Sequence, residues 1–95
     1  MPSPRSLIHS EWFDYSLQLL GDIRQIDVVL ARDFYRIACY ADWVPLIDDR
    51  SPVRVFRTEP MLREDGQIVR VFVYFVLRAD QSVELQHIEA VPQQS

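Results

Sequence analysis

The run of residues from Ile68 to Arg78, IVRVFVYFVLR, constrains the fold of this chain more than any other segment. Nine of its eleven residues are apolar or aromatic, which favours a β-strand. One set of alternate residues is wholly apolar: Val69, Val71, Val73, Phe75 and Leu77. The other set mixes aromatic rings with arginines: Ile68, Arg70, Phe72, Tyr74, Val76 and Arg78. The segment is therefore typical of a central strand with one core face and a second packing or binding face.

The length and composition of the chain predict one folded domain spanning residues 1–95. Ninety-five residues leave room for a single core, and 48% hydrophobic residues with only two glycines are typical of a globular protein. A core of this size is near the lower limit of independent stability, so we expect dimerisation or docking on a partner. We expect the chain ends, at about residues 1–6 and 91–95, to be flexible.

Several features indicate a protein that works in the cytoplasm. No apolar run reaches the roughly 18 residues of a membrane span, and residues 1–12 lack the apolar stretch of a signal peptide. Cys39 is the only cysteine, so neither an intramolecular disulfide nor a cysteine-based zinc site can form. We therefore predict a cytoplasmic protein without membrane contact, metal or other cofactor.

The charge of the chain is unevenly distributed. The net charge is −4, and all ten basic residues are arginines. Residues 1–49 carry four arginines and eight acids, residues 50–78 carry six arginines and three acids, and residues 79–95 carry three acids and no base. Such an acidic chain is a poor general binder of nucleic acid, because phosphate attraction dominates that affinity. The central arginines either form a basic strip that binds an anion or pair with the excess acids.

Periodicity and capping residues predict two helices in the first half of the chain. Ser10 is a good N-cap for a first helix, and Gly21 is a helix stop. Asp22 and Gln25 resemble a capping box for a second helix. The second helix has an apolar stripe at helical spacing: Ile23, Ile26, Leu30, Phe34, Ile37 and Ala41. Pro45 ends the helical region.

A β-meander is predicted in the second half of the chain. The strand candidates are residues 53–58, 68–78 and 83–89, with a short N-terminal strand at residues 7–9 as a further candidate. Asp65 and Gly66 form a strong hairpin signal, and strands joined by tight turns are antiparallel. The predicted fold is therefore α+β: an N-terminal helical hairpin packed on a three- or four-stranded antiparallel sheet.

Regular alternation assigns the remaining strand residues to the two faces of the sheet. With the helices on the wholly apolar face, Val55 and Leu85 join the core, whereas Arg54 lies on the other face beside Arg70. His87 has the parity of Leu85. A regular last strand therefore points His87 toward the core and away from Arg70, and only a bulge would bring the two together.

The pattern from about residue 45 to residue 91 resembles the RelE/ParE superfamily of bacterial toxins. The matching segments are VRVFRTEP, IVRVFVYFVLRAD and SVELQHIEAV, preceded by a helical hairpin as in that fold. The resemblance implies a compact α+β domain whose concave sheet face is the working surface. Many members are ribosome-dependent endoribonucleases that cut messenger RNA without a metal, and the ParE branch poisons DNA gyrase. Both kinds are usually neutralised by an antitoxin whose extended segment wraps the toxin.

The resemblance also implies roles for individual residues. Arg70 matches the arginine of the long strand and would hold the phosphate, with Arg54 or Arg57 as a second contact. His87 matches a C-terminal histidine or tyrosine and would act as acid or base near neutral pH. Glu59 would be its carboxylate partner. In such a reaction the ribose 2′-OH attacks the phosphate while a cation stabilises the developing charge.

The chain departs from the family pattern in its charge. Active ribonuclease toxins are basic and often rich in lysine, whereas this chain has no lysine and a net charge of −4, which disfavours docking on RNA or the ribosome. The sequence therefore favours a RelE/ParE-like protein that acts through protein–protein binding, without strong catalytic activity. The partner would be an antitoxin-like segment or a second copy. The binding candidates are Arg54, Arg57, Phe72, Tyr74 and Arg78.

Two other functions remain open, and whether the protein is an enzyme is undecided between them. The first is a ribosome-dependent messenger RNA endoribonuclease of a toxin–antitoxin pair, with Arg70, His87 and Glu59 as catalytic residues. The second is an unrelated small α+β domain that binds an acidic ligand through its arginines.

Overall fold

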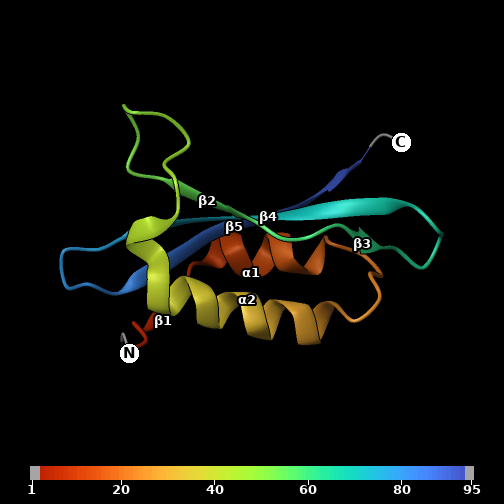
Figure 1. The fold of residues 1–95 in the computed structure, drawn as a ribbon, viewed down its shortest axis with the longest axis horizontal. Helices are drawn as coiled ribbons and strands as arrows, with labels where there is room; N and C mark the ends of the chain where they lie inside the picture. The colour runs from red at the N-terminus through yellow and green to blue at the C-terminus, as the bar shows by residue number, and fades with distance from the viewer. Residues whose placement is uncertain (1–2, 94–95) are drawn as a thin grey trace.

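Two helices and an open five-stranded sheet form a compact α+β unit (Figure 1). The computed structural model describes residues 3–93. The helices are α1 (Glu11–Gln18) and α2 (Ile26–Tyr40), and a 3-10 turn, η1 (Ala41–Trp43), follows α2. The strands are β1 (Leu7–His9), β2 (Arg54–Arg57), β3 (Met61–Leu62), β4 (Ile68–Leu77) and β5 (Val83–Pro92). Neither described helix is long and apolar enough to cross a membrane.

The long apolar segment forms β4 and lies in the middle of the sheet, which confirms the prediction of a central strand. The strand order is β1-β5-β4-β2, and β3 also pairs with β4. Strands β2, β3 and β5 are antiparallel to β4, whereas β1 is parallel to β5, with Leu7 opposite Val83. The sheet therefore has one short strand more than the sequence predicts, and its N-terminal strand is not antiparallel.

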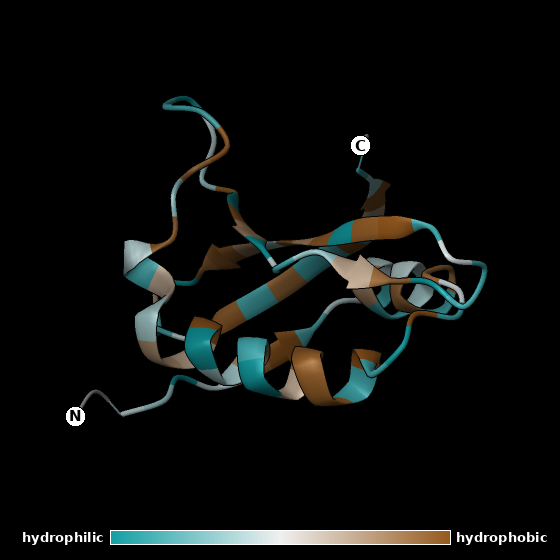
Figure 2. Ribbon diagram, turned by 45° about the vertical axis from the view of Figure 1, so that its right-hand side comes forward, coloured by the Kyte–Doolittle hydropathy of each residue, from teal (hydrophilic) through white to brown (hydrophobic). Residues whose placement is uncertain are grey.

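Both helices lie on one face of the sheet (Figure 1), and the wholly apolar side chains of β4 pack in one core with residues of both helices. The side chains of Val69, Val71, Val73 and Phe75 are fully buried. Figure 2 shows β4 as almost continuously apolar, whereas polar and apolar residues alternate along β5. Leu30 and Ile37 of α2 and Phe13 of α1 complete the core. Each such apolar side chain contributes about 1.5–3 kcal/mol when it is fully buried.

The start of α2 differs from the sequence prediction. Ser10 caps α1 as predicted, because its Oγ atom accepts a hydrogen bond from a helix N–H. The capping box expected at Asp22 and Gln25 is wrong: α2 begins only after Gln25, which makes no side-chain cap bond. Ile23 instead pairs with Arg63 in an isolated β-bridge, and this contact keeps the segment extended.

Pairing extends further toward both ends than the sequence predicts. Residues 1–2 and 94–95 of the expected flexible ends lie outside the described residues. The Arg5 N–H donates to the Ala38 carbonyl, and the Ser6 carbonyl accepts from the Val83 N–H. At the other end, β5 continues to Pro92. Backbone pairing therefore includes residues 5–6 and 91–92.

Candidate functional site

The strand register brings six chemically active side chains together on the sheet face that the helices leave uncovered. We call this group the open-face cluster: Arg57, Arg70, Phe72, Tyr74, His87 and Glu89. Two of them come from β5, three from β4 and one from β2. The cluster includes both of the central aromatic residues that the sequence assigns to a binding face.

A β-bulge places His87 in this cluster. Tyr74 lies opposite His87, but its neighbour Phe75 lies opposite Leu85, so Gln86 is the extra residue in β5. The prediction from regular alternation, that His87 points to the core, is therefore wrong. Beyond the bulge the core position is occupied by Ile88, which is 1% exposed. Arg70 and His87 consequently share one face of the sheet.

Tyr74, His87 and Glu89 form a connected polar group within the cluster. The Tyr74 hydroxyl donates a hydrogen bond to Glu89 Oε1 at 2.7 Å, and His87 Nε2 lies 3.6 Å from Glu89 Oε2. The rings of Tyr74 and His87 lie 5.6 Å apart. Partial burial and the bond to Glu89 raise the pKa of Tyr74 to about 12. Tyr74 therefore remains a proton donor to Glu89 at neutral pH.

Two arginines flank Phe72 in the same cluster. The Arg57 guanidinium carbon lies 5.1 Å from the Phe72 ring centroid, a cation–π distance. Arg70 follows on β4, two residues from Phe72, and its side chain is half-buried. The Nε atom of Arg70 is buried and has no hydrogen-bond partner among the described residues. A buried donor without a partner is unfavourable, so this guanidinium is well suited to an added anion.

Glu59 lies apart from the open-face cluster, so the predicted pairing of Glu59 with His87 is wrong. Glu59 lines a hollow of about 440 Å³ together with Arg24, Val29 and Arg32, which belong to α2 and the segment before it. The carboxylate beside His87 is that of Glu89, which sequence reasoning missed.

Arg54 and Arg78 also lie outside the cluster. Arg54 lies opposite Phe75, which faces the helices, so the face predicted for Arg54 is wrong. Its Nη1 atom donates to the carbonyl oxygens of Val44 at 2.7 Å and Asp42 at 3.3 Å, and it thereby holds η1 against β2. Arg78 follows the end of β4 and is exposed in the turn before β5.

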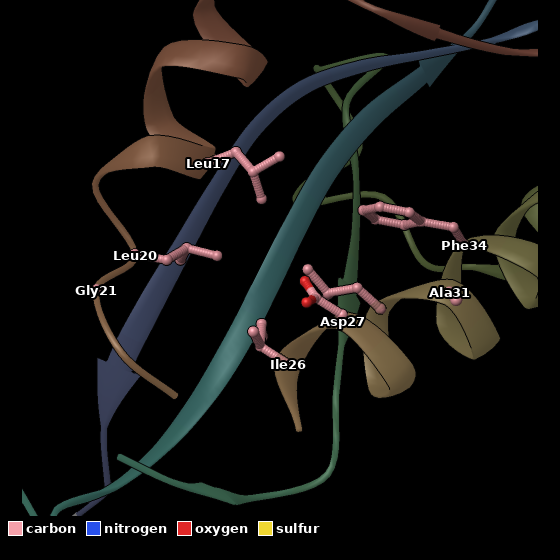
Figure 3. Close-up of a pocket in the computed structure, with 8 residues that line it drawn as sticks. Leu17, Leu20, Gly21, Ile26, Asp27, Ala31 and Phe34 are labelled. Atoms are coloured by element: carbon pink, nitrogen blue, oxygen red, sulfur yellow. The ribbon is translucent and has the colours of Figure 1, made fainter. Parts of the chain in front are cut away.

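A separate apolar hollow lies between the two helices. Leu17 from α1 and Leu20 from the segment after it face Ile26 and Phe34 from α2 across this hollow of about 360 Å³ (Figure 3). Asp27 is its one charged lining residue. No predicted site residue reaches it. Elsewhere in residues 3–93, no three His, Cys, Asp or Glu side chains gather in a way that could hold a metal ion.

The open-face cluster thus combines two arginines, two aromatic rings, a histidine and a carboxylate on one face of the sheet. Its arginines can bind an anion, its aromatic rings can pack against a partner, and His87 with Glu89 can move a proton. The chain matches no protein-family model, no curated protein and no solved structure.

Proposed function

We propose that the protein is a RelE/ParE-like cytoplasmic protein that binds a protein partner on its open sheet face, without strong catalytic activity. Arg70 carries this proposal, because its buried Nε atom lacks a hydrogen-bond partner in the described part of the chain. A partner carboxylate that binds the half-buried Arg70 guanidinium would also meet the second cation at Arg57. Half-buried Phe72 and Tyr74 supply the aromatic centre that is typical of interface hot spots.

The expected helical hairpin is part of the same proposal. Two helices precede the meander in the chain, and both lie on one face of the sheet (Figure 1), whereas the cluster occupies the other face. This arrangement agrees with the RelE/ParE element order and leaves the working face free. The partner would then be an extended, antitoxin-like segment that carries carboxylates, or a second copy of the chain.

The experiment begins with co-purification of the tagged protein from its native host, followed by a binding titration with the purified partner. Arg70→Ala and Phe72→Ala should each weaken binding by about tenfold or more, as truncation of an interface hot spot does. Arg50→Ala is the matched control, because Arg50 is exposed in the loop before β2. Equal affinity of all three variants for the partner would place binding elsewhere and refute the proposal.

A second candidate function is cleavage of RNA, and the observation that favours it is the shared face of Arg70 and His87. His87 would take the proton of a ribose 2′-OH, and that oxygen would attack the adjacent phosphorus as the 5′-oxygen of the next nucleotide leaves and takes a proton from water. Arg57 and Arg70 would stabilise the negative charge on the phosphate. Glu89 would orient the imidazole. The net charge of −4 counts against this candidate.

Expression in a bacterial host separates the two functions. The readout is the growth arrest that expression of the parent causes. If the protein acts by binding alone, His87→Ala should arrest growth as the parent does, whereas Arg70→Ala should not. If it cleaves RNA, both variants should be inactive, and the purified parent should cut a synthetic RNA but spare the same strand with 2′-deoxyribose at the cleavage position. Binding of a small acidic ligand in place of a protein would instead favour an unrelated α+β domain.

A further inference from the structure

Helix α1 exposes an aromatic and aliphatic stripe on the flank that faces away from α2. Trp12, Tyr15 and Leu19 are 76%, 58% and 67% exposed. Their spacing along the chain places them on one side of the helix. Leu17 and Leu20 of the same segment turn instead toward α2 (Figure 3). Three large exposed apolar side chains on one side of a short helix form a candidate docking surface.

The Trp12 indole stands between two shallow hollows, and each hollow contains a carboxylate. On one side, Glu11 and Tyr15 line a hollow of about 470 Å³ with Trp12. On the other side, Trp12 lines a hollow of about 440 Å³ with residues of β5 that include Glu84 and His87. The Tyr15 ring meets the indole edge to face, with centroids 6.4 Å apart. A cation placed over the indole would therefore have an acidic residue on either side.

The whole neighbourhood of this stripe in the sequence is acidic. Helix α1 carries Glu11 and Asp14 in its first turn and no basic residue in its last turn. No arginine or lysine occurs between Arg5 and Arg24. Asp14 is paired with His9, whose Nδ1 atom lies 3.1 Å from Asp14 Oδ1. Among residues 3–93, the carboxylates of Glu11 and Glu84 form no ion pair, so the surface around Trp12 is complementary to a cationic one.

We propose that this acidic aromatic surface, formed by Glu11, Trp12, Tyr15, Leu19 and Glu84, docks a basic amphipathic helix of another protein. Apolar side chains of that helix pack on Tyr15 and Leu19, and a lysine or arginine lies over the Trp12 ring. A second copy of the chain fits poorly, because a two-fold contact would place each acidic helix against the other. His87 lines both this surface and the open-face cluster, but the proposal does not rest on the function proposed for that cluster, whose arginines select an acidic partner.

A synthetic peptide pair provides the probe for this surface. One peptide is a helix with a leucine stripe and lysines elsewhere, and its match has glutamate in place of each lysine. The full chain carries Trp43→Phe, so that indole fluorescence reports Trp12 alone. The lysine peptide should shift the Trp12 emission to the blue and bind with a micromolar dissociation constant, as expected for an interface below standard size. Absence of binding, or equal binding of the glutamate peptide, would overturn the proposal.

Variants then locate the contact by calorimetry. Trp12→Ala should weaken binding of the lysine peptide by about tenfold or more. The double variant Glu11→Gln with Glu84→Gln should bind more weakly and with less dependence on salt. Tyr35→Ala is the control, because Tyr35 is 61% exposed on α2, and it should leave binding unchanged. Unchanged affinity of Trp12→Ala would refute the site. So would self-association of the parent that Trp12→Ala abolishes, since the occupant would then be a second copy.

Discussion

The hydroxyl of Ser16 joins α1 to the bulge in β5, and its removal tests how the fold maintains the open-face cluster. Ser16 is buried, and its Oγ atom donates to the Phe13 carbonyl at 2.9 Å and accepts from the Ile88 N–H at 3.0 Å. Ile88 directly follows His87, at the point where the bulge changes the phase of the strand. In Ser16→Ala the Ile88 N–H stays buried but loses its acceptor.

The expected loss of stability can be worked out from this geometry. A buried donor left unpaired costs about 1–3 kcal/mol. Alanine returns about 0.5 kcal/mol through its higher helix propensity. The free energy of unfolding should therefore fall by about 0.5–2.5 kcal/mol. The bulge itself should persist, because removing it would expose Ile88, whose burial contributes about 1.5–3 kcal/mol.

Urea denaturation measures the free energy of unfolding, and hydrogen exchange measures the protection of the Ile88 N–H. Gln18→Ala is the matched control, because Gln18 is exposed on the same helix. Exchange at Ile88 should be about tenfold faster for each 1.4 kcal/mol lost locally. If Ser16→Ala is as stable as Gln18→Ala and Ile88 stays protected, the Ser16 bond does not support the bulge.

Two further predictions concern pH and backbone conformation. Folding raises the pKa of Tyr74 from 10.0 to about 12, so its contribution to stability is full below about pH 10 and is lost as the pH rises toward 12. In Tyr74→Phe the free energy of unfolding, measured by denaturation at a series of alkaline pH values, should fall less steeply between these limits. Gly66→Ala should cost about 1–2 kcal/mol, because Gly66 has a φ of +90° with open space around it. Gly21→Ala should lower the free energy of unfolding more than Gly66→Ala does, since its φ is +79° and a new Cβ would lie 2.8 Å from Arg63 Nη1. Thermal denaturation measures both losses. Equal losses at the two glycines would show that Arg63 moves aside freely.

The elements that the sequence predicts well are those with a long, regular pattern. The β4 segment alternates over ten residues, and the buried face of α2 repeats over four turns, so burial alone specifies both. The start of α2 was mispredicted because the Ile23–Arg63 bridge is a contact between distant segments, which overrides a local capping signal. Arg54 was mispredicted because β2 is short and because Val55, whose burial suggested a core position, lies opposite Tyr74 and outside the core cluster. The Val55 N–H bonds to Pro45, so the preceding loop runs along this edge of the sheet.

The position of His87 could have been read from the sequence, because the apolar residues of β5 change phase. Val83 and Leu85 are two apart, but the next large apolar residue, Ile88, comes three residues later, and a strand can bury all three only with one extra residue between them. A regular strand would instead bury His87 and Glu89, and desolvating the ionised carboxylate would cost several kcal/mol. The bulge costs less, since Ser16 accepts the buried Ile88 N–H beside it. Core packing is therefore sufficient to place His87 and Glu89 beside Tyr74. No further feature of the fold is needed to explain why these two side chains lie on the open face.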